Sequence, residues 1–201
     1  MKQKNSRVNV RAITMTGLFG ALSAVLMMFS FSIPVLMPSF IKMDFSELPA
    51  LIAAFAMGPV SGAMVCLIKN LINLMFTTTG GVGELSNFIL GCMFVIPAGF
   101  IYKRNKTKRS ALIGSIVGAV VMAVVSVISN YFIVYPVYTM FMPMDAIIAM
   151  YHAINPRVNT LLQALIMFNM PFTFVKGMFS VVITFLVYKH ISPIIKGTHK
   201  Y

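Results

Sequence analysis

Two lysines lie within long apolar segments of the sequence, where a charged group must find a polar partner. Lys69 shares a helical face with Asn73, four residues later. Lys176 shares a face with Asn169 and Thr173, provided that the helix is continuous there. An ionisable group at membrane depth normally faces the protein interior and marks a functional site. Each lysine is therefore predicted either to contact a ligand or to pair with one of the carboxylates Asp44, Glu47 and Glu84 and so join two helices.

Other polar and aromatic side chains are expected at the same end of the protein as Lys176. Asparagine amides both donate and accept, which suits a ligand rich in hydroxyl and amide groups. Polar groups that converge among apolar side chains form a small-molecule pocket. Alternatives remain, since Glu84 can instead stabilise a helix N-terminus and any one phenylalanine more often packs than stacks. The predicted substrate-binding residues are Asn87, Asn130, Thr173, Lys176, Asn169, Asp44, Glu84, Phe40, Phe88 and Tyr131.

The sequence carries no recognisable catalytic, metal or nucleotide motif. It has neither H-E-x-x-H nor G-x-S-x-G, and its three histidines, His152, His190 and His199, are scattered. The glycine run at 80–83 lacks the lysine and the hydroxyl of a phosphate-binding loop. We therefore expect no enzyme activity, no metal and no cofactor, and any energy for transport must come from another subunit.

The composition indicates an integral membrane protein. Of the 201 residues, 59% are hydrophobic and 10% are charged, against about 45–50% and about 25% in soluble domains. A net charge of +12 is also typical of proteins that bind nucleic acid, but the basic residues cluster beside apolar segments rather than on one surface. The expected partner is the lipid bilayer, and no nucleic acid is predicted.

Hydropathy predicts a single-domain, all-α integral membrane protein with six transmembrane helices in one bundle. The helices are expected at 12–33, 48–57, 60–76, 85–102, 111–132 and 171–191. Pro171 is expected to divide the last apolar stretch and to leave a short outer helix before it. Between the helices we expect a basic N-terminus at 1–11, a lid loop at 34–47, a basic loop at 103–110 and an extracellular loop at 133–159.

Charge asymmetry predicts how this bundle is oriented. With six helices both termini lie on one side, and that side holds twelve of the sixteen basic residues, so the termini are predicted to be cytoplasmic. The outer half keeps four basic and four acidic residues. A nearly neutral outer half suits a neutral or zwitterionic ligand better than a polyanion.

The first helix carries two pairs of small residues spaced four apart. These are Gly17 with Ala21, and Gly20 with Ala24. Such spacing allows close approach of another helix in lipid. The partner is either a helix of another subunit or a helix of the same bundle, and the sequence leaves both open.

Four segments together resemble the substrate-binding S components of energy-coupling factor (ECF) transporters, and most of all the riboflavin-specific members. The segments are DFSELPALIAAFAMGP at 44–59, IKNL at 68–71, GELSNF at 83–88 and PFTFVKG at 171–177. The resemblance implies a six-helix bundle that binds riboflavin near the extracellular face, capped by the loop after the first helix. It implies polar contacts from Asn87, Asn130, Thr173, Lys176 and Asn169. It also implies that small residues of the first helix meet a transmembrane coupling subunit (EcfT), which is attached to two ATPase subunits.

Two other functions remain as alternatives. A stand-alone facilitator or secondary carrier for a small neutral molecule is disfavoured because the sequence lacks the two matched halves of many such carriers. A membrane enzyme is disfavoured by the missing catalytic motifs. Uptake without an ATPase would favour the first alternative, and a chemically changed ligand would favour the second.

Overall fold

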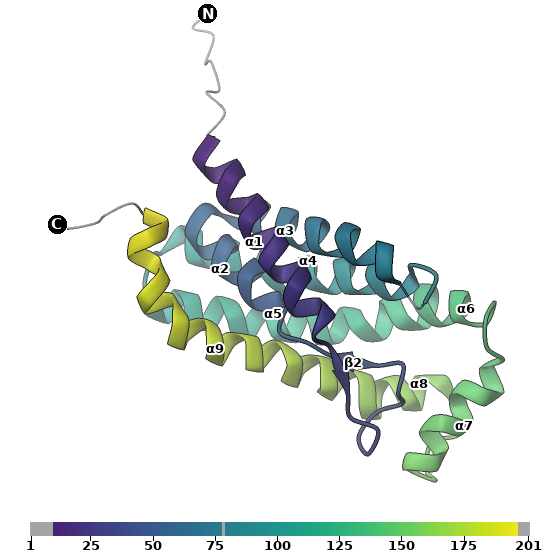
Figure 1. Cartoon of the computed structure of the whole chain (residues 1–201). Coiled ribbons are helices and arrows are strands. Elements are labelled where there is room, and N and C mark those ends of the chain that lie inside the picture. The colour runs from purple at the N-terminus through teal and green to yellow at the C-terminus, as the bar shows by residue number, and fades with distance from the viewer. Residues whose placement is uncertain (1–9, 78, 197–201) are drawn as a thin grey trace, which may run out of the picture.

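A computed structural model describes residues 10–77 and 79–196 of the chain, with side chains described as far as residue 187. The protein is mostly helical (Figure 1). The helices are α1 (Val10–Met28), α2 (Glu47–Met57), α3 (Pro59–Asn73), α4 (Val82–Arg104), α5 (Lys108–Ser129), α6 (Tyr135–Tyr138), α7 (Met144–Ile154), α8 (Leu161–Ala164) and α9 (Met170–Lys196). The start of α1 and the end of α9 lie at one end of the bundle, and α7 and α8 lie at the other (Figure 1). Most of the basic N-terminus predicted at 1–11 lies outside the described residues.

Five helical segments are long and apolar enough to cross a membrane. They are Val10–Met28, Pro59–Phe76, Val82–Arg104, Lys108–Tyr138 and Leu161–Val187. In each, fewer than half of the residues of the most apolar window are buried inside the protein. Apolar surface of this extent has to face lipid, so the chain is a multi-pass membrane protein.

The short helix α2 lies at the centre of the bundle. It packs against α1, α3, α4 and α9, and each residue of Ala50–Ala54 is at most 1% exposed. A helix of 11 residues is about 16 Å long, roughly half the thickness of the hydrocarbon core. Protein rather than lipid therefore surrounds its apolar side chains. The chain reverses at Gly58, whose φ of 107° favours glycine, and Pro59 then begins α3.

Small residues set the closest helix crossings. A Cβ atom at Gly118 of α5 would collide with the carbonyl oxygen of Phe94 in α4. A Cβ atom at Gly20 of α1 would lie 2.6 Å from Ile68 Cγ2 in α3. Both glycines therefore hold their helices at a distance that any larger residue would increase.

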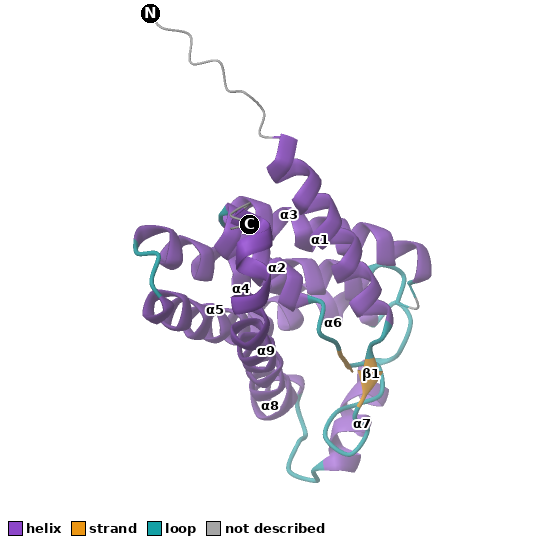
Figure 2. Ribbon diagram, turned by 60° about the vertical axis from the view of Figure 1, so that its left-hand side comes forward, coloured by secondary structure: helices purple, strands orange, loops and turns teal. Residues whose placement is uncertain are grey.

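The segment after α1 differs from the prediction. The helix ends at Met28 rather than at residue 33, because the chain turns into a two-stranded antiparallel hairpin. Its strands are β1 (Phe31–Ser32) and β2 (Lys42–Met43), and Phe31 pairs with Met43. The all-α prediction therefore misses this hairpin, which lies beside α7 in Figure 2. The rest of the predicted lid, 34–47, includes the connection between the strands and the start of α2.

Two predictions about the second half of the chain are wrong. The region 133–159 is not a loop, since it contains α6 and also α7, whose Ile147 and Tyr151 are buried. Pro171 does not divide the last apolar stretch either. Helical residues run without a break from Leu161 to Lys196, because a wide π turn at Leu165–Asn169 accommodates the proline. A second π turn, Asn130–Val134, joins α5 to α6 in the same way.

Candidate functional site

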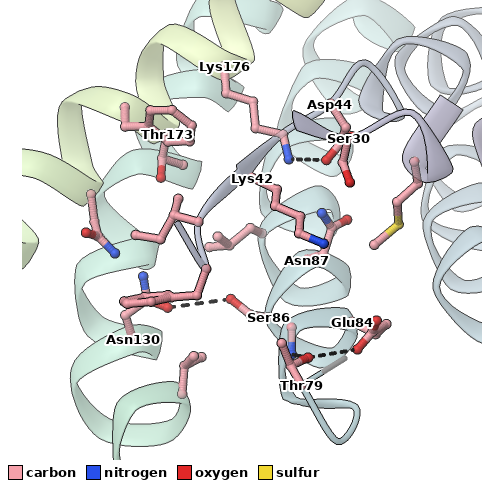
Figure 3. Close-up of a pocket in the computed structure, with 18 of the residues that line it drawn as sticks. Ser30, Lys42, Asp44, Thr79, Glu84, Ser86, Asn87, Asn130, Thr173 and Lys176 are labelled. Carbon is pink, nitrogen blue, oxygen red and sulfur yellow. Dashed lines mark hydrogen bonds and ion pairs between the residues drawn. The ribbon is translucent and has the colours of Figure 1, made fainter. Parts of the chain in front are cut away.

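A cavity of about 360 Å³ opens among the ends of α1, α4, α5 and α9 and the hairpin, within the size range of small-molecule sites. It lies at the end of the bundle opposite the start of α1 and the end of α9. Its wall combines methionines and aromatic rings with polar side chains (Figure 3). Eight of the ten predicted binding residues line it: Asn87, Asn130, Thr173, Lys176, Asn169, Asp44, Glu84 and Phe40.

An ion pair between Lys176 and Asp44 joins α9 to the segment that leads from β2 into α2. The Lys176 Nζ atom donates to Asp44 Oδ2 at 2.8 Å, and the two side chains are 12% and 4% exposed. Burial opposes ionisation of Asp44, but the ammonium groups of Lys176 and Lys69 outweigh it and hold the pKa of Asp44 at about 2. This carboxylate is therefore charged at neutral pH and fixes one wall of the cavity.

The second buried lysine, Lys69, pairs with a carboxylate, which is the second of the two roles predicted for it. Lys69 Nζ donates to Glu47 Oε1 at 2.7 Å and to Ser46 Oγ at 2.6 Å, and Lys69 is fully buried. Ser46 in turn donates its backbone N–H to Asp44 Oδ1 at 2.9 Å. Polar contacts thus run from α9 through Asp44 and Ser46 to α3.

Asn87 and Asn130 face the cavity from α4 and from the end of α5. Asn130 Oδ1 accepts from Ser86 Oγ at 3.5 Å. Asn87 Oδ1 is buried and has no hydrogen-bond partner within the described part of the chain. Buried amide oxygens are rarely left unpaired, since the lost hydration costs about 1–3 kcal/mol. The orphaned oxygen leaves a hydrogen-bond acceptor available to a ligand in this cavity.

Two tyrosines and one asparagine form a buried network at the wall of the cavity, which Tyr135 and Asn169 line. The Tyr151 hydroxyl donates to Asn169 Oδ1 at 2.6 Å, and Asn169 Nδ2 donates to the Tyr135 hydroxyl at 3.3 Å. Burial, followed by the neighbouring Tyr135, raises the pKa of Tyr151, so its hydroxyl stays neutral. Sequence reasoning missed Tyr135 and also Tyr138, which lines the cavity. Reading Pro136 as part of a loop hid both of them.

Three more charged residues line the cavity, namely Glu84, Lys42 and Glu47, and the last of these is paired with Lys69. Glu84 lies in the first turn of α4, where an acid is favourable, and its Oε2 also accepts from Thr77 Oγ1 at 2.8 Å. Both predicted roles of Glu84, at the helix terminus and in the cavity wall, thus fit its position. The prediction missed Lys42, which extends from β2 toward Asn87 (Figure 3). With Lys176 paired to Asp44 and Glu47 paired to Lys69, one cation and one anion remain in the lining, so the wall is close to neutral.

Phe40 contributes an aromatic surface, but two other predicted aromatic residues do not line the cavity. The Phe40 ring lies 6.3 Å from that of Tyr135, edge to face. Phe88 instead packs against the central hydrophobic core, and Tyr131 is 41% exposed. Each directly follows an asparagine that faces the cavity, so the rotation of about 100° per helical residue turns it away.

The two small-residue pairs of α1 face different surroundings, which corrects half of the predicted partner interface. Gly20 and Ala24 are buried against α3, and Asn73 Nδ2 donates to the Ala24 carbonyl at 3.2 Å. Gly17 and Ala21 are exposed, and nothing lies within 4 Å of a Cβ placed at Gly17. Internal packing therefore accounts for the first pair, and an outward surface remains for the second.

Comparison with known proteins assigns the family. Residues 11–188 match the family described as "ECF transporter, substrate-specific component". The chain belongs to this family. Among its relatives, "Riboflavin transporter RibU" of Staphylococcus aureus is 33% identical over 97% of both chains. "Riboflavin transporter FmnP" of Bacillus subtilis is 28% identical over 92% of this S component and 94% of the relative.

A solved structure supports the same assignment at the level of the fold. The structure described as "Structure and mechanism of the S component of a bacterial ECF transporter" superposes with a TM-score of 0.73 at 30% identity. The match covers 93% of this S component and 98% of the other chain. The relatives are transporter components rather than enzymes, which confirms the prediction made from the missing catalytic motifs.

Proposed function

We propose that this S component binds riboflavin in the cavity and serves as the capture subunit of an ATP-driven ECF importer. The observation that carries the proposal is the orphaned Asn87 oxygen in a cavity of ligand size. Relatives named as riboflavin transporters match nearly the whole chain, which supports riboflavin as the ligand. No prosthetic cofactor takes part in this proposal, because riboflavin is cargo.

The chemistry of the wall suits riboflavin. Its hydroxylated side chain needs several hydrogen-bond partners, and Asn87, Asn130, Thr173 and Lys176 offer them within one cavity. Its flat ring needs an apolar slot, and Phe40 with neighbouring methionines provides one. The near balance of charges favours an uncharged ligand over a polyanion.

The membrane arrangement proposed here has six passes of the chain, made by α1, α3, α4, α5, α9 and the short helix α2 together with the segment that leads into it. Both termini then lie in the cytoplasm, and the basic turn at 103–110 lies with them. The cavity opens outward, and segment 34–47 acts as its cap. Support for the cap comes from Phe40 and Asp44, which reach the cavity wall from this segment.

A coupling module is the proposed source of energy, since the sequence has no nucleotide-binding motif of its own. The family assignment implies a transmembrane coupling subunit and two ATPase subunits as partners. We place the contact with the coupling subunit on the outward surface of α1 at Gly17 and Ala21. Small residues there allow close approach of a partner helix.

Fluorescence titration tests the proposal. Purified protein is expected to quench riboflavin fluorescence on binding, and Asn87→Ala is expected to weaken the affinity about tenfold by removing the oxygen that awaits a partner. Asn105→Ala, at the far end of α4, is the matched control and should bind normally. The proposal would be contradicted if the wild-type protein, at micromolar concentration, left the fluorescence of riboflavin unchanged.

A further inference from the structure

Two exposed prolines stand at the same place relative to the two π turns. The first turn covers Asn130–Val134 and is followed by Pro136, and the second covers Leu165–Asn169 and is followed by Pro171. In both, the residue before the proline donates its N–H to a carbonyl five residues back. Tyr135 donates to Asn130, and Met170 donates to Leu165. Exposed side chains contribute little packing, so any role of these prolines lies in the backbone.

The effect of a proline on the preceding turn explains this recurrence. In a continuous α-helix, residue 136 would donate to the carbonyl of residue 132, and residue 171 to that of residue 167. Proline has no N–H to donate, and its ring clashes with that carbonyl. A π turn inserts one extra residue and so avoids the α-helical alternative. Pro97 shows that proline alone does not suffice, because α4 is α-helical on both sides of it.

The extra residue decides which side chains enter the cavity. Met122 and Tyr138 both line it, although they are 16 positions apart. An uninterrupted α-helix would place them about 160° apart, on opposite sides. One inserted residue reduces this angle to about 60°. The π turn therefore rotates the outer end of the helix toward the cavity.

The two π turns also meet through side chains. Tyr135 directly follows the first turn, and Asn169 ends the second. Asn169 Nδ2 donates to the Tyr135 hydroxyl at 3.3 Å, and Tyr151 contacts both residues. The wall at Tyr135 thus depends on the rotation at the first turn, and it meets the end of the second turn at Asn169.

We propose that Pro136 and Pro171 are positioning residues of the ligand cavity, which act by penalising the α-helical alternative and so holding the two π turns, of which the first directs Tyr135 and Tyr138 toward the wall and the second ends at Asn169, the partner of Tyr135. The inference rests on the proposed function, because it assigns these residues a part in riboflavin binding. Neither proline lines the cavity, so both would act through the helix backbone.

Substitution combined with deletion tests this mechanism. Pro136→Ala is expected to let the turn close to an α-helix and weaken riboflavin binding about tenfold. Additional deletion of Phe132, which is 70% exposed, removes the extra residue and should restore the affinity, because an α-helix then gives Tyr135 its original direction. The equivalent pair is Pro171→Ala with deletion of the exposed Met167. Pro97→Ala is the control and should bind like the wild type.

A second measurement does not depend on riboflavin. Val134→Cys places a thiol in the cavity wall, where a small water-soluble methanethiosulfonate should label it above the background of the buried Cys66 and Cys92. Adding Pro136→Ala should slow this labelling several-fold, and deletion of Phe132 should restore it. Unchanged labelling and affinity in Pro136→Ala would overturn the inference, as would a folded deletion variant without rescue. If the wild-type protein does not bind riboflavin, the proposed function is refuted instead. The labelling rates would still decide the role of Pro136.

Discussion

At the residue scale, Lys176 has two structural roles, since it lines the cavity and forms the ion pair with Asp44. The sequence presented these roles as alternatives, yet one ammonium group can serve both because it has three donors. Asp44 belongs to the proposed cap, so the pair connects cap position to ligand contact. Lys69 differs, because its contacts with Glu47 and Ser46 leave it fully buried behind the wall.

Removing the ammonium group of Lys176 should damage both binding and stability. Lys176→Met leaves the Asp44 carboxylate buried without the ammonium group of its ion pair, and breaking a buried pair from one side costs about 3–5 kcal/mol. We expect riboflavin affinity to fall at least tenfold in titration and the melting temperature to fall with it. Adding Asp44→Asn should recover part of the melting temperature but not the affinity. A single variant as stable as the wild type would contradict this account of the pair.

The depressed pKa of Asp44 sets a pH range for the same ion pair. Because the folded pKa of about 2 lies below the ordinary value of 3.8, the contribution is complete above pH 4 to 5 and is lost as the pH falls toward 2. The difference corresponds to about 2 kcal/mol at neutral pH. The stability gap between wild type and Asp44→Asn should therefore stay constant from about pH 7.5 to about pH 5 in thermal melts. The gap should then shrink below about pH 4, and a gap that stays constant down to about pH 3 would show that Asp44 keeps its ordinary pKa in the folded protein.

Helix crossings at glycine determine the shape of the bundle at the element scale. α4 and α5 approach closely at Gly118 and Gly114, while α1 and α3 do so at Gly20. These contacts fix the spacing of the helices whose outer ends surround the cavity. Exposed glycines such as Gly17 lack such neighbours.

A methyl group should therefore have opposite consequences at two glycines. Gly118→Ala places a Cβ against the Phe94 carbonyl oxygen and should force α5 away from α4, lowering the melting temperature by several degrees. Gly17→Ala meets nothing within 4 Å and should leave the melting temperature unchanged or slightly higher. Equal melting temperatures for the two variants would mean that α4 and α5 can separate at no cost.

The two faces of α1 have different surroundings at the scale of the whole molecule. One face packs inside the bundle through Gly20 and Ala24, and the other presents Gly17 and Ala21 outward. This division lets the cavity and the proposed coupling surface lie on one rigid protein while remaining chemically independent. Ligand capture and energy coupling should accordingly be separable by mutation.

A bulky residue on the outward face should block transport without preventing binding. Ala21→Leu is expected to keep normal riboflavin quenching but reduce ATP-driven uptake more than tenfold in vesicles that contain the coupling module. Val120→Leu, on the exposed side of α5, is the control and should affect neither measurement. Loss of binding together with uptake in Ala21→Leu would mean that α1 packs differently from the structure described here.

Several features of this protein follow from the sequence alone. Apolar segments of sufficient length must be helical in lipid, where every backbone polar group needs an internal partner, and their positions can be found along the chain. Costly polar residues such as Asn87, Asn130 and Lys176 stand out there because little else justifies them. Their convergence was predicted, as was membership of the family. Riboflavin binding itself remains a prediction to be measured.

Only the tertiary structure decided which residues act together. Pro136 and Pro171 resemble helix ends in sequence, yet a π turn before each keeps the helix continuous, and Tyr135 and Tyr138 enter the cavity as a result. Likewise, Gly17 and Gly20 have the same side chain, and only the position of Ile68 assigns Gly20 to internal packing. The physical reason is the same in both cases. Helical phase and helix contacts depend on neighbours distant in sequence, whereas hydropathy depends on the segment itself.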